Sequence, residues 1–115
     1  MTVQQIIDSK KFEVISVGES TEVEIQDIFC CDLLSIAMSK APAGGVWVTV
    51  MANVNTLAVA SLTETAMIVL AEGVKLDEET KQKAQTQKIT VLATTESTYH
   101  TARQLDRMLH ENNLL

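Results

Sequence analysis

Apolar residues in the second half of the chain gather in three short runs, and a segment with helical spacing follows each run. The runs are residues 46–51, 66–71 and 89–93. They contain many β-branched side chains and little polar alternation, which is typical of strands covered on both faces. The residues expected to cap the following helices are Asn53 or Asn55, Asp77, and Thr95 or Ser97. This alternation predicts βαβ units, whose crossovers produce a parallel sheet.

The N-terminal part of the chain follows another pattern. Thr2 and Gln5 have the spacing of a capping box, which predicts a short helix at the start of the chain. Residues 12–17 form a mostly apolar run, and residues 22–26 alternate between polar and apolar side chains. Both segments are therefore expected to be strands, paired as a hairpin around residues 18–21.

A further helix is expected after residues 28–31. Asp32 is placed to cap this helix, and apolar residues then recur at helical spacing, at Leu34, Ala37, Met38 and Ala41. No linker, repeat or low-complexity stretch divides the chain. The pattern as a whole predicts one α/β domain over residues 1–115, a mainly parallel sheet of βαβ units with an N-terminal helix and a hairpin-like piece.

Composition narrows the classes of partner. The 115 residues include 9 Lys and Arg against 15 Asp and Glu, which gives a formal charge of -6. Nucleic acids and anionic membranes are bound mainly by clustered Lys and Arg, so neither is expected as a partner. No apolar run approaches the roughly 18 residues of a membrane span, and the N-terminus lacks the pattern of a signal peptide. We therefore expect a soluble, cytoplasmic protein.

Polar residues follow each of the three predicted strands. Ligands of open parallel sheets bind beyond the carboxyl ends of the strands, near the amino ends of the following helices. The residues at these positions that could bind a small molecule through hydrogen bonds are Asn53, Asn55, Gly73, Thr94, Thr95 and Ser97. Each polar side chain among them is also explained as a helix cap, so the hypothesis depends on their convergence from three strands.

No catalytic, metal or cofactor site is expected from the motifs. The four glycines lack the spacing of a phosphate loop or a dinucleotide fingerprint. His100 and His110 are about three helical turns apart, too far to share a metal ion. Cys30 and Cys31 are adjacent, which fits neither an ordinary disulfide nor a zinc site. A reactive Cys31 thiol is the alternative, against the more common case of a buried, unreactive cysteine.

Apolar residues beyond the needs of one core predict a face for self-association. Leu33, Ile36 and Met38 widen the apolar face of the helix expected after residue 32, and Trp47 and Met51 lie on the strand that follows. The alternative is that a strand covered by helices on both sides needs apolar residues at every position. We expect a homodimer.

Four stretches, taken together, resemble the DRTGG domain family, in its free-standing form. They are CDLLS at 31–35; VWVTV at 46–50, running through Asn53 and Asn55 to AVASL at 58–62; LAEG at 70–73, leading to DEET at 77–80; and VLAT at 91–94, followed by STY at 97–99. The resemblance implies an α/β fold similar to the N-terminal domain of HPr kinase/phosphorylase, without the kinase domain. It also implies a regulatory or dimerising role, as in the copies attached to CBS-domain pyrophosphatases.

The chain departs from the residues that give the family its name. The Asp-Arg pair expected near residues 52–55 is absent, and the expected Thr-Gly-Gly is Ala71, Glu72 and Gly73. A carboxylate disfavours a phosphate placed directly beside it, so Glu72 favours contacts to the base or sugar of a nucleotide over contacts to its phosphates.

Two hypotheses of function follow. The first is a non-catalytic, homodimeric regulatory module that senses a small ligand, with an adenine nucleotide as the candidate. The alternative is a pure interaction module that dimerises and binds an enzyme partner, in which the polar residues at the strand ends are only caps.

Overall fold

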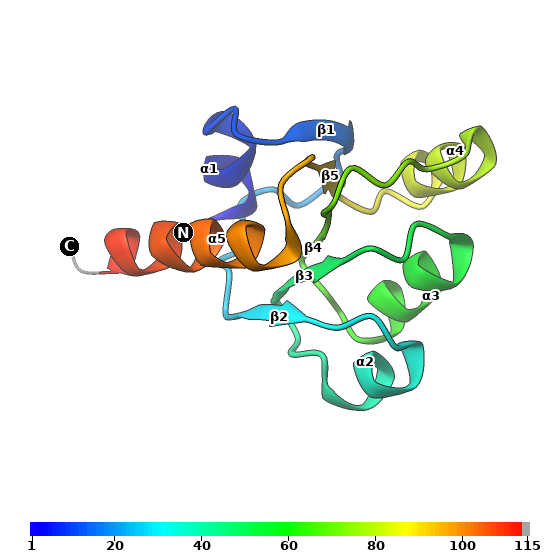
Figure 1. Cartoon of the computed structure of the whole chain (residues 1–115), viewed down its shortest axis with the longest axis horizontal. Helices are drawn as coiled ribbons and strands as arrows, with labels where there is room; N and C mark the ends of the chain where they lie inside the picture. Colours follow the sequence, from blue (N-terminus) through cyan, green and yellow to red (C-terminus); the bar gives the residue numbers. More distant parts are fainter. Residues whose placement is uncertain (114–115) are drawn as a thin grey trace.

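The computed structural model describes residues 1–113, which form five helices and five strands (Figure 1). In chain order the elements are α1 (Val3–Asp8), β1 (Glu13–Ser16), β2 (Ile28–Cys30), α2 (Leu34–Lys40), β3 (Val46–Thr49), α3 (Val54–Leu62), β4 (Met67–Leu70), α4 (Glu78–Thr86), β5 (Val91–Ala93) and α5 (Thr98–Asn113). Within this described part, no helix is both long and apolar enough to cross a membrane.

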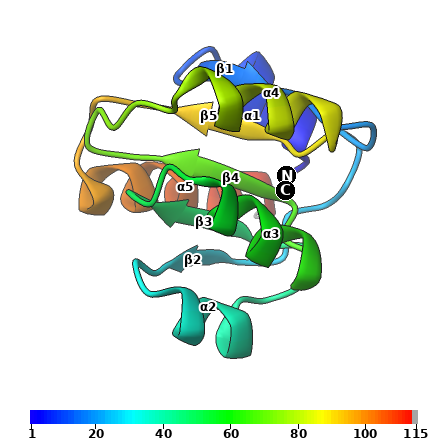
Figure 2. The same ribbon diagram turned by 90° about the vertical axis from the view of Figure 1, so that its right-hand side faces the viewer.

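The strands of the described chain form one sheet in the order β1-β5-β4-β3-β2, which runs from top to bottom in Figure 2. β2, β3, β4 and β5 are parallel, with Val48 of β3 opposite Val69 of β4 and Val69 opposite Leu92 of β5. β1 pairs antiparallel with β5 at one edge of the sheet. The sequence-based prediction of an α/β domain with a mainly parallel sheet and an N-terminal helix is therefore confirmed.

Helices cover both faces of this sheet, with α1 and α5 on one side and α2, α3 and α4 on the other (Figure 1). Val46 and Val48 of β3 pack toward the first pair, in a core shared with Leu105 of α5. Trp47, between them, packs on the opposite face with Leu57 of α3. Because neighbouring residues of a strand point to opposite faces, both sets must be apolar, and this explains the unbroken apolar runs in the sequence.

Three predicted caps are present. Thr2 and Gln5 form the complete capping box of α1. The side chain of Asn53 accepts hydrogen bonds from the first turn of α3, and Asp77 accepts one from the backbone N–H of Thr80 in α4 at 2.7 Å. This backbone hydrogen bond, with the Thr80 hydroxyl, lowers the pKa of the Asp77 carboxyl. The starts of these helices are thus determined by residues that are close together in the sequence.

The predicted hairpin around residues 18–21 is wrong. Residues 22–26 form no strand and contribute only an isolated bridge between Thr2 and Glu24. β1 instead joins β5, and the backbone N–H of Gly18 donates to the Thr90 hydroxyl at 2.9 Å. Pairing with β5 extends the sheet and its cores, which a separate two-stranded hairpin would not do.

Asp32 is not a helix cap, which corrects a second prediction. Residues 28–30 are a fourth parallel strand, and α2 begins after Leu33 without any side-chain cap. The Asp32 carboxylate instead accepts hydrogen bonds from the Thr49 hydroxyl at 2.7 Å and from the backbone N–H of Val50 at 2.9 Å. It therefore ties the end of β2 to the end of β3.

Trp47 does not belong to a self-association face. Its side chain is 1% exposed, and its indole N–H donates to the carbonyl oxygen of Cys31 at 2.9 Å. Of the other four apolar residues of that prediction, Leu33, Ile36 and Met38 are 54%, 43% and 46% exposed. Met51 is partly buried and packs against the same core as Trp47. The part of the predicted face that stays exposed therefore lies on and beside α2.

The docking of β1 on β5 makes Gly18 sensitive to substitution. A Cβ atom at this position would lie 2.5 Å from the carbonyl oxygen of Lys88, which belongs to the backbone and cannot rotate away. We expect Gly18→Ala to destabilise the protein by about 1–3 kcal/mol in urea unfolding. Ser20→Ala, in the same exposed loop, is the control and should be neutral; equal stability of the two variants would contradict the packing described here.

Candidate functional site

The loops that follow β4 and β5 are tied together at the carboxyl edge of the sheet. The backbone N–H of Glu72 donates to the carbonyl oxygen of Glu96 at 2.7 Å, and that of Gly73 donates to Thr94 at 3.0 Å. Glu72 and Gly73 have φ angles of 63° and 72°, so two successive residues adopt the left-handed conformation. This turn brings the backbone after β4 against the backbone after β5.

A hollow of about 380 Å³ lies beside this turn, and we call it the edge hollow. Three of the predicted ligand-binding residues line it: Gly73, Thr94 and Thr95. Three lysines from separate segments line it as well: Lys11 before β1, Lys75 before α4, and Lys81 within α4. Glu13 is the one carboxylate among its lining residues. The edge hollow thus combines neutral hydrogen-bonding groups with an excess of positive charge, which suits an anionic ligand.

The remaining predicted residues lie outside the edge hollow. Asn53 caps α3 through hydrogen bonds from the backbone N–H groups of Asn55 at 3.0 Å and Thr56 at 3.2 Å. It borders a small apolar pit between α3 and β4. Ser97 accepts a hydrogen bond from the backbone N–H of His100 at 3.1 Å, which is the capping role also considered from the sequence. The six predicted residues therefore do not converge on one hollow.

Thr95 and Asn55 differ from the other predicted residues because their side chains are exposed and make no hydrogen bond within the described chain. Thr94, in contrast, accepts a hydrogen bond from the backbone N–H of Glu96 at 3.2 Å. Thr95 lines the edge hollow and Asn55 does not. Thr95 is thus the predicted side chain most available to a ligand there.

The side chain of Glu72 caps the amino end of α5. Its carboxylate accepts a hydrogen bond at 2.8 Å from the backbone N–H of Thr98, the first residue of that helix. A carboxylate at this position is stabilised by the free N–H groups and the positive end of the helix dipole. The amino end of α5, near which ligands of parallel sheets commonly bind, is therefore occupied by a carboxylate of the chain itself.

Among residues 1–113, no three His, Cys, Asp or Glu side chains come together in a group that could hold a metal ion. Burial, reinforced by the negative charge of Asp32, raises the pKa of the Cys30 thiol and disfavours its reactive thiolate. The Cys31 thiol donates to the carbonyl oxygen of Leu33 at 3.3 Å.

Sequence and structure comparisons place the chain in a family. The DRTGG domain matches residues 5–108, so the chain belongs to the DRTGG domain family. No curated protein matches it. Its fold is similar to the crystal structure of the CBS and DRTGG domains of the regulatory region of Clostridium perfringens pyrophosphatase, complexed with the activator diadenosine tetraphosphate. The TM-score is 0.70 at 15% identity over 90% of this chain, which spans 45% of the matched chain.

Two of the three lysines of the edge hollow, Lys11 and Lys81, were not predicted from the sequence. Lys11 and Lys81 were not considered, because they precede β1 and lie inside α4, far from the strand ends in sequence. Lys75 follows Gly73 closely, but nothing in the sequence separates it from an ordinary surface lysine. No local motif marks these lysines. Their positive charges form a cluster only because the fold brings the segments together.

Glu72 should stabilise the start of α5. We expect Glu72→Ala to lower the free energy of unfolding by about 0.5–2 kcal/mol, because the Thr98 N–H loses its partner. Glu64→Ala is a matched control, since Glu64 is also exposed, also has a positive φ of 58°, and caps no helix. Urea unfolding of the two variants measures the difference. Equal losses would mean that backbone conformation, and not the cap, determines the effect.

Proposed function

We propose that this chain is a non-catalytic regulatory module that binds an adenine nucleotide in the edge hollow. The observation that carries the proposal is the arrangement of Lys11, Lys75 and Lys81 around Gly73 and Thr95 in a chain with a formal charge of -6. Two regions distant in sequence contribute these lysines, Lys11 before β1 and Lys75 with Lys81 around the start of α4, so their proximity depends on the fold. The resulting field favours a phosphate-bearing ligand.

The neutral groups of the edge hollow complement the lysines. The Thr95 hydroxyl can donate to and accept from a ribose or base, and Gly73 lets the backbone approach a ligand closely. The lysines can hold a phosphate by charge-assisted hydrogen bonds, which are stronger than neutral ones. With the amino end of α5 closed by Glu72, the phosphate would bind through side chains and not through the helix end.

The comparisons support the regulatory part of this proposal. The chain shares its family with a domain from the regulatory region of a pyrophosphatase, and that region was crystallised with a nucleotide activator. A non-catalytic role is consistent with the lining of the edge hollow, which contains no His, Cys or Ser side chain. A single carboxylate, Glu13, provides no acid/base pair.

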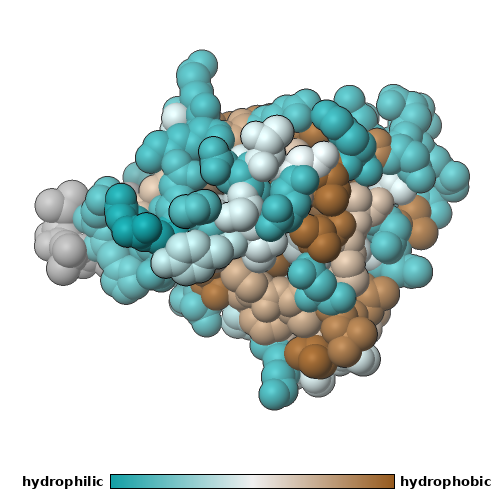
Figure 3. Space-filling model, in the orientation of Figure 1, coloured by the Kyte–Doolittle hydropathy of each residue, from teal (hydrophilic) through white to brown (hydrophobic). Residues whose placement is uncertain are grey.

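We also propose that the module is a homodimer through α2. Leu33, Ile36 and Met38 expose apolar surface there, and brown surface is visible in the corresponding part of Figure 3. α2 itself buries only Ala37 completely, so much of its apolar surface has no partner within the described chain. The same surface favours the second candidate function, in which the chain binds an enzyme partner and no ligand.

Nucleotide binding should depend on Thr95 and not on Asn55. We expect AMP at millimolar concentration to raise the unfolding temperature of the wild-type protein. Thr95→Ala should weaken AMP binding by about 3- to 10-fold through the loss of a neutral hydrogen bond. Asn55→Ala is the matched control and should bind AMP like wild type. An unchanged unfolding temperature of the wild type with AMP would refute ligand binding and favour the pure interaction module.

Self-association should depend on the exposed apolar side chains of α2. We expect Ile36→Glu to convert a dimer to a monomer, because the carboxylate would be buried without a partner in the interface. Leu62→Glu on α3, where Leu62 is 70% exposed, is the control and should remain dimeric. Sedimentation equilibrium measures the masses. A monomeric wild-type protein would contradict the dimer.

A further inference from the structure

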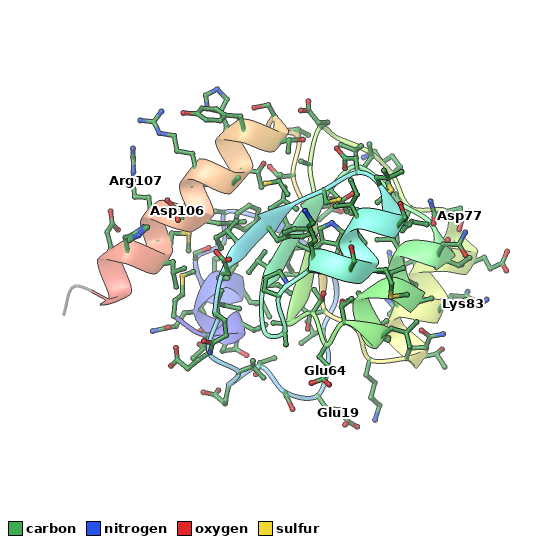
Figure 4. The ribbon with its side chains drawn as sticks, turned by 90° about the horizontal axis from the view of Figure 1, so that it is seen from below. Glu19, Glu64, Asp77, Lys83, Asp106 and Arg107 are labelled. Carbon is green, nitrogen blue, oxygen red and sulfur yellow. The ribbon has the colours of Figure 1, made fainter. Side chains whose placement is uncertain are left out.

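A second hollow runs along the exposed side of α5, and nothing above assigns it a role. It encloses about 640 Å³ and is lined by three positively charged side chains, Lys11, Arg103 and Arg107, with His100 beside them. We call it the α5 groove. Arg103 and Arg107 are one helical turn apart, so both can face the same groove. Figure 4 shows Arg107 projecting outward from α5.

The α5 groove and the edge hollow together hold most of the positive charge of the chain. Arg103 and Arg107 are the only arginines of the sequence. Three Lys and Arg residues line each hollow, and Lys11 lines both, so five of the 9 basic residues lie along one continuous strip.

Among the residues that the structure describes, none of these five side chains forms an ion pair with a carboxylate. Within the part of the chain that the structure describes, the ion pairs are those of the Met1 ammonium with Glu24, Lys88 with Glu19, and His110 with Asp106. Glu96 and Glu111 line the α5 groove but pair with neither arginine. The positive charge of the strip is therefore available to a partner.

The strip is longer than one phosphate requires. His100 to Arg107 alone spans roughly 10 Å along the helix axis, at about 1.5 Å per residue. We propose that the ligand of the edge hollow carries a chain of several phosphates, which passes Lys11 and lies in the α5 groove against Arg103 and Arg107. This inference rests on the proposed nucleotide function and specifies the phosphate end of the ligand.

The chemistry of the groove fits this occupant. Guanidinium groups bind phosphate oxygens in a bidentate manner, and both arginines are exposed enough to do so. A second copy of α5 related by a twofold axis would bring arginines opposite arginines, so charge disfavours self-association here. The shared lining residue, Lys11, favours one ligand that is continuous across both hollows over a separate acidic partner.

Calorimetric titration of the whole chain tests the inference, with adenosine, AMP, ATP and inorganic triphosphate as probes. ATP should bind at least tenfold more tightly than AMP, and the difference should shrink as salt is added. The double variant Arg103→Gln, Arg107→Gln should bind ATP about as weakly as AMP, with AMP binding unchanged. Lys40→Gln, Lys83→Gln is the matched control for charge, because neither lysine lines either hollow and Lys83 lies far from Arg107 in Figure 4.

The outcomes separate the two proposals. Equal affinities for AMP and ATP, insensitive to the arginine variant, would refute the phosphate chain and leave the nucleotide function standing. If triphosphate binds as tightly as ATP and AMP does not bind, the result would support the α5 groove as a site for a phosphate chain. The same result would refute the proposed specificity for a nucleotide. An acidic peptide of glutamates that binds more tightly than ATP, and loses binding in the arginine variant, would overturn the inference in favour of a protein partner.

Discussion

The structure depends on one constraint, which is that a parallel sheet must be covered on both faces. β2, β3, β4 and β5 can be parallel only if the chain returns across the sheet between them, and α2, α3 and α4 make these returns on one face. The other face is left for α1 and α5, which close it with a separate core. The sheet edges, the exposed sides of α2 and α5, and the carboxyl ends of the strands are what remains for function.

At the carboxyl edge, a free backbone N–H at the start of a helix finds its hydrogen-bond acceptor within the chain and not in a ligand. Glu72 places its carboxylate on the first N–H of α5, and the left-handed turn at Glu72 and Gly73 holds it there. The positive end of the helix dipole is thereby neutralised within the chain. Positive charge at this edge comes instead from lysine side chains, whose long stems can adapt to the shape of a phosphate-bearing ligand.

Features that depend on neighbours in sequence were predicted correctly. The caps at Thr2, Asn53 and Asp77 and the apolar runs of β3, β4 and β5 follow from spacing alone. Two predictions that required the partner of a segment were wrong, the hairpin around residues 18–21 and the helix cap at Asp32. The edge strand β2 is only three residues long and has little pattern. The carboxylate of Asp32 was assigned to a helix, but its partners are Thr49, at the end of β3, and Val50, the residue after it.

The sequence by itself determined the fold class, the family resemblance and the positions of the strand ends, because these depend on periodicity and local hydrogen bonding. Tertiary structure decided that β1 pairs with β5, that Trp47 is buried, and which polar residues share a hollow. It also gathered Lys11, Lys81 and Arg107 on one side of an acidic protein. The physical reason is that electrostatic interactions depend on distances in space. Charges far apart in the sequence can therefore contribute to one field, and their spacing along the chain does not reveal it.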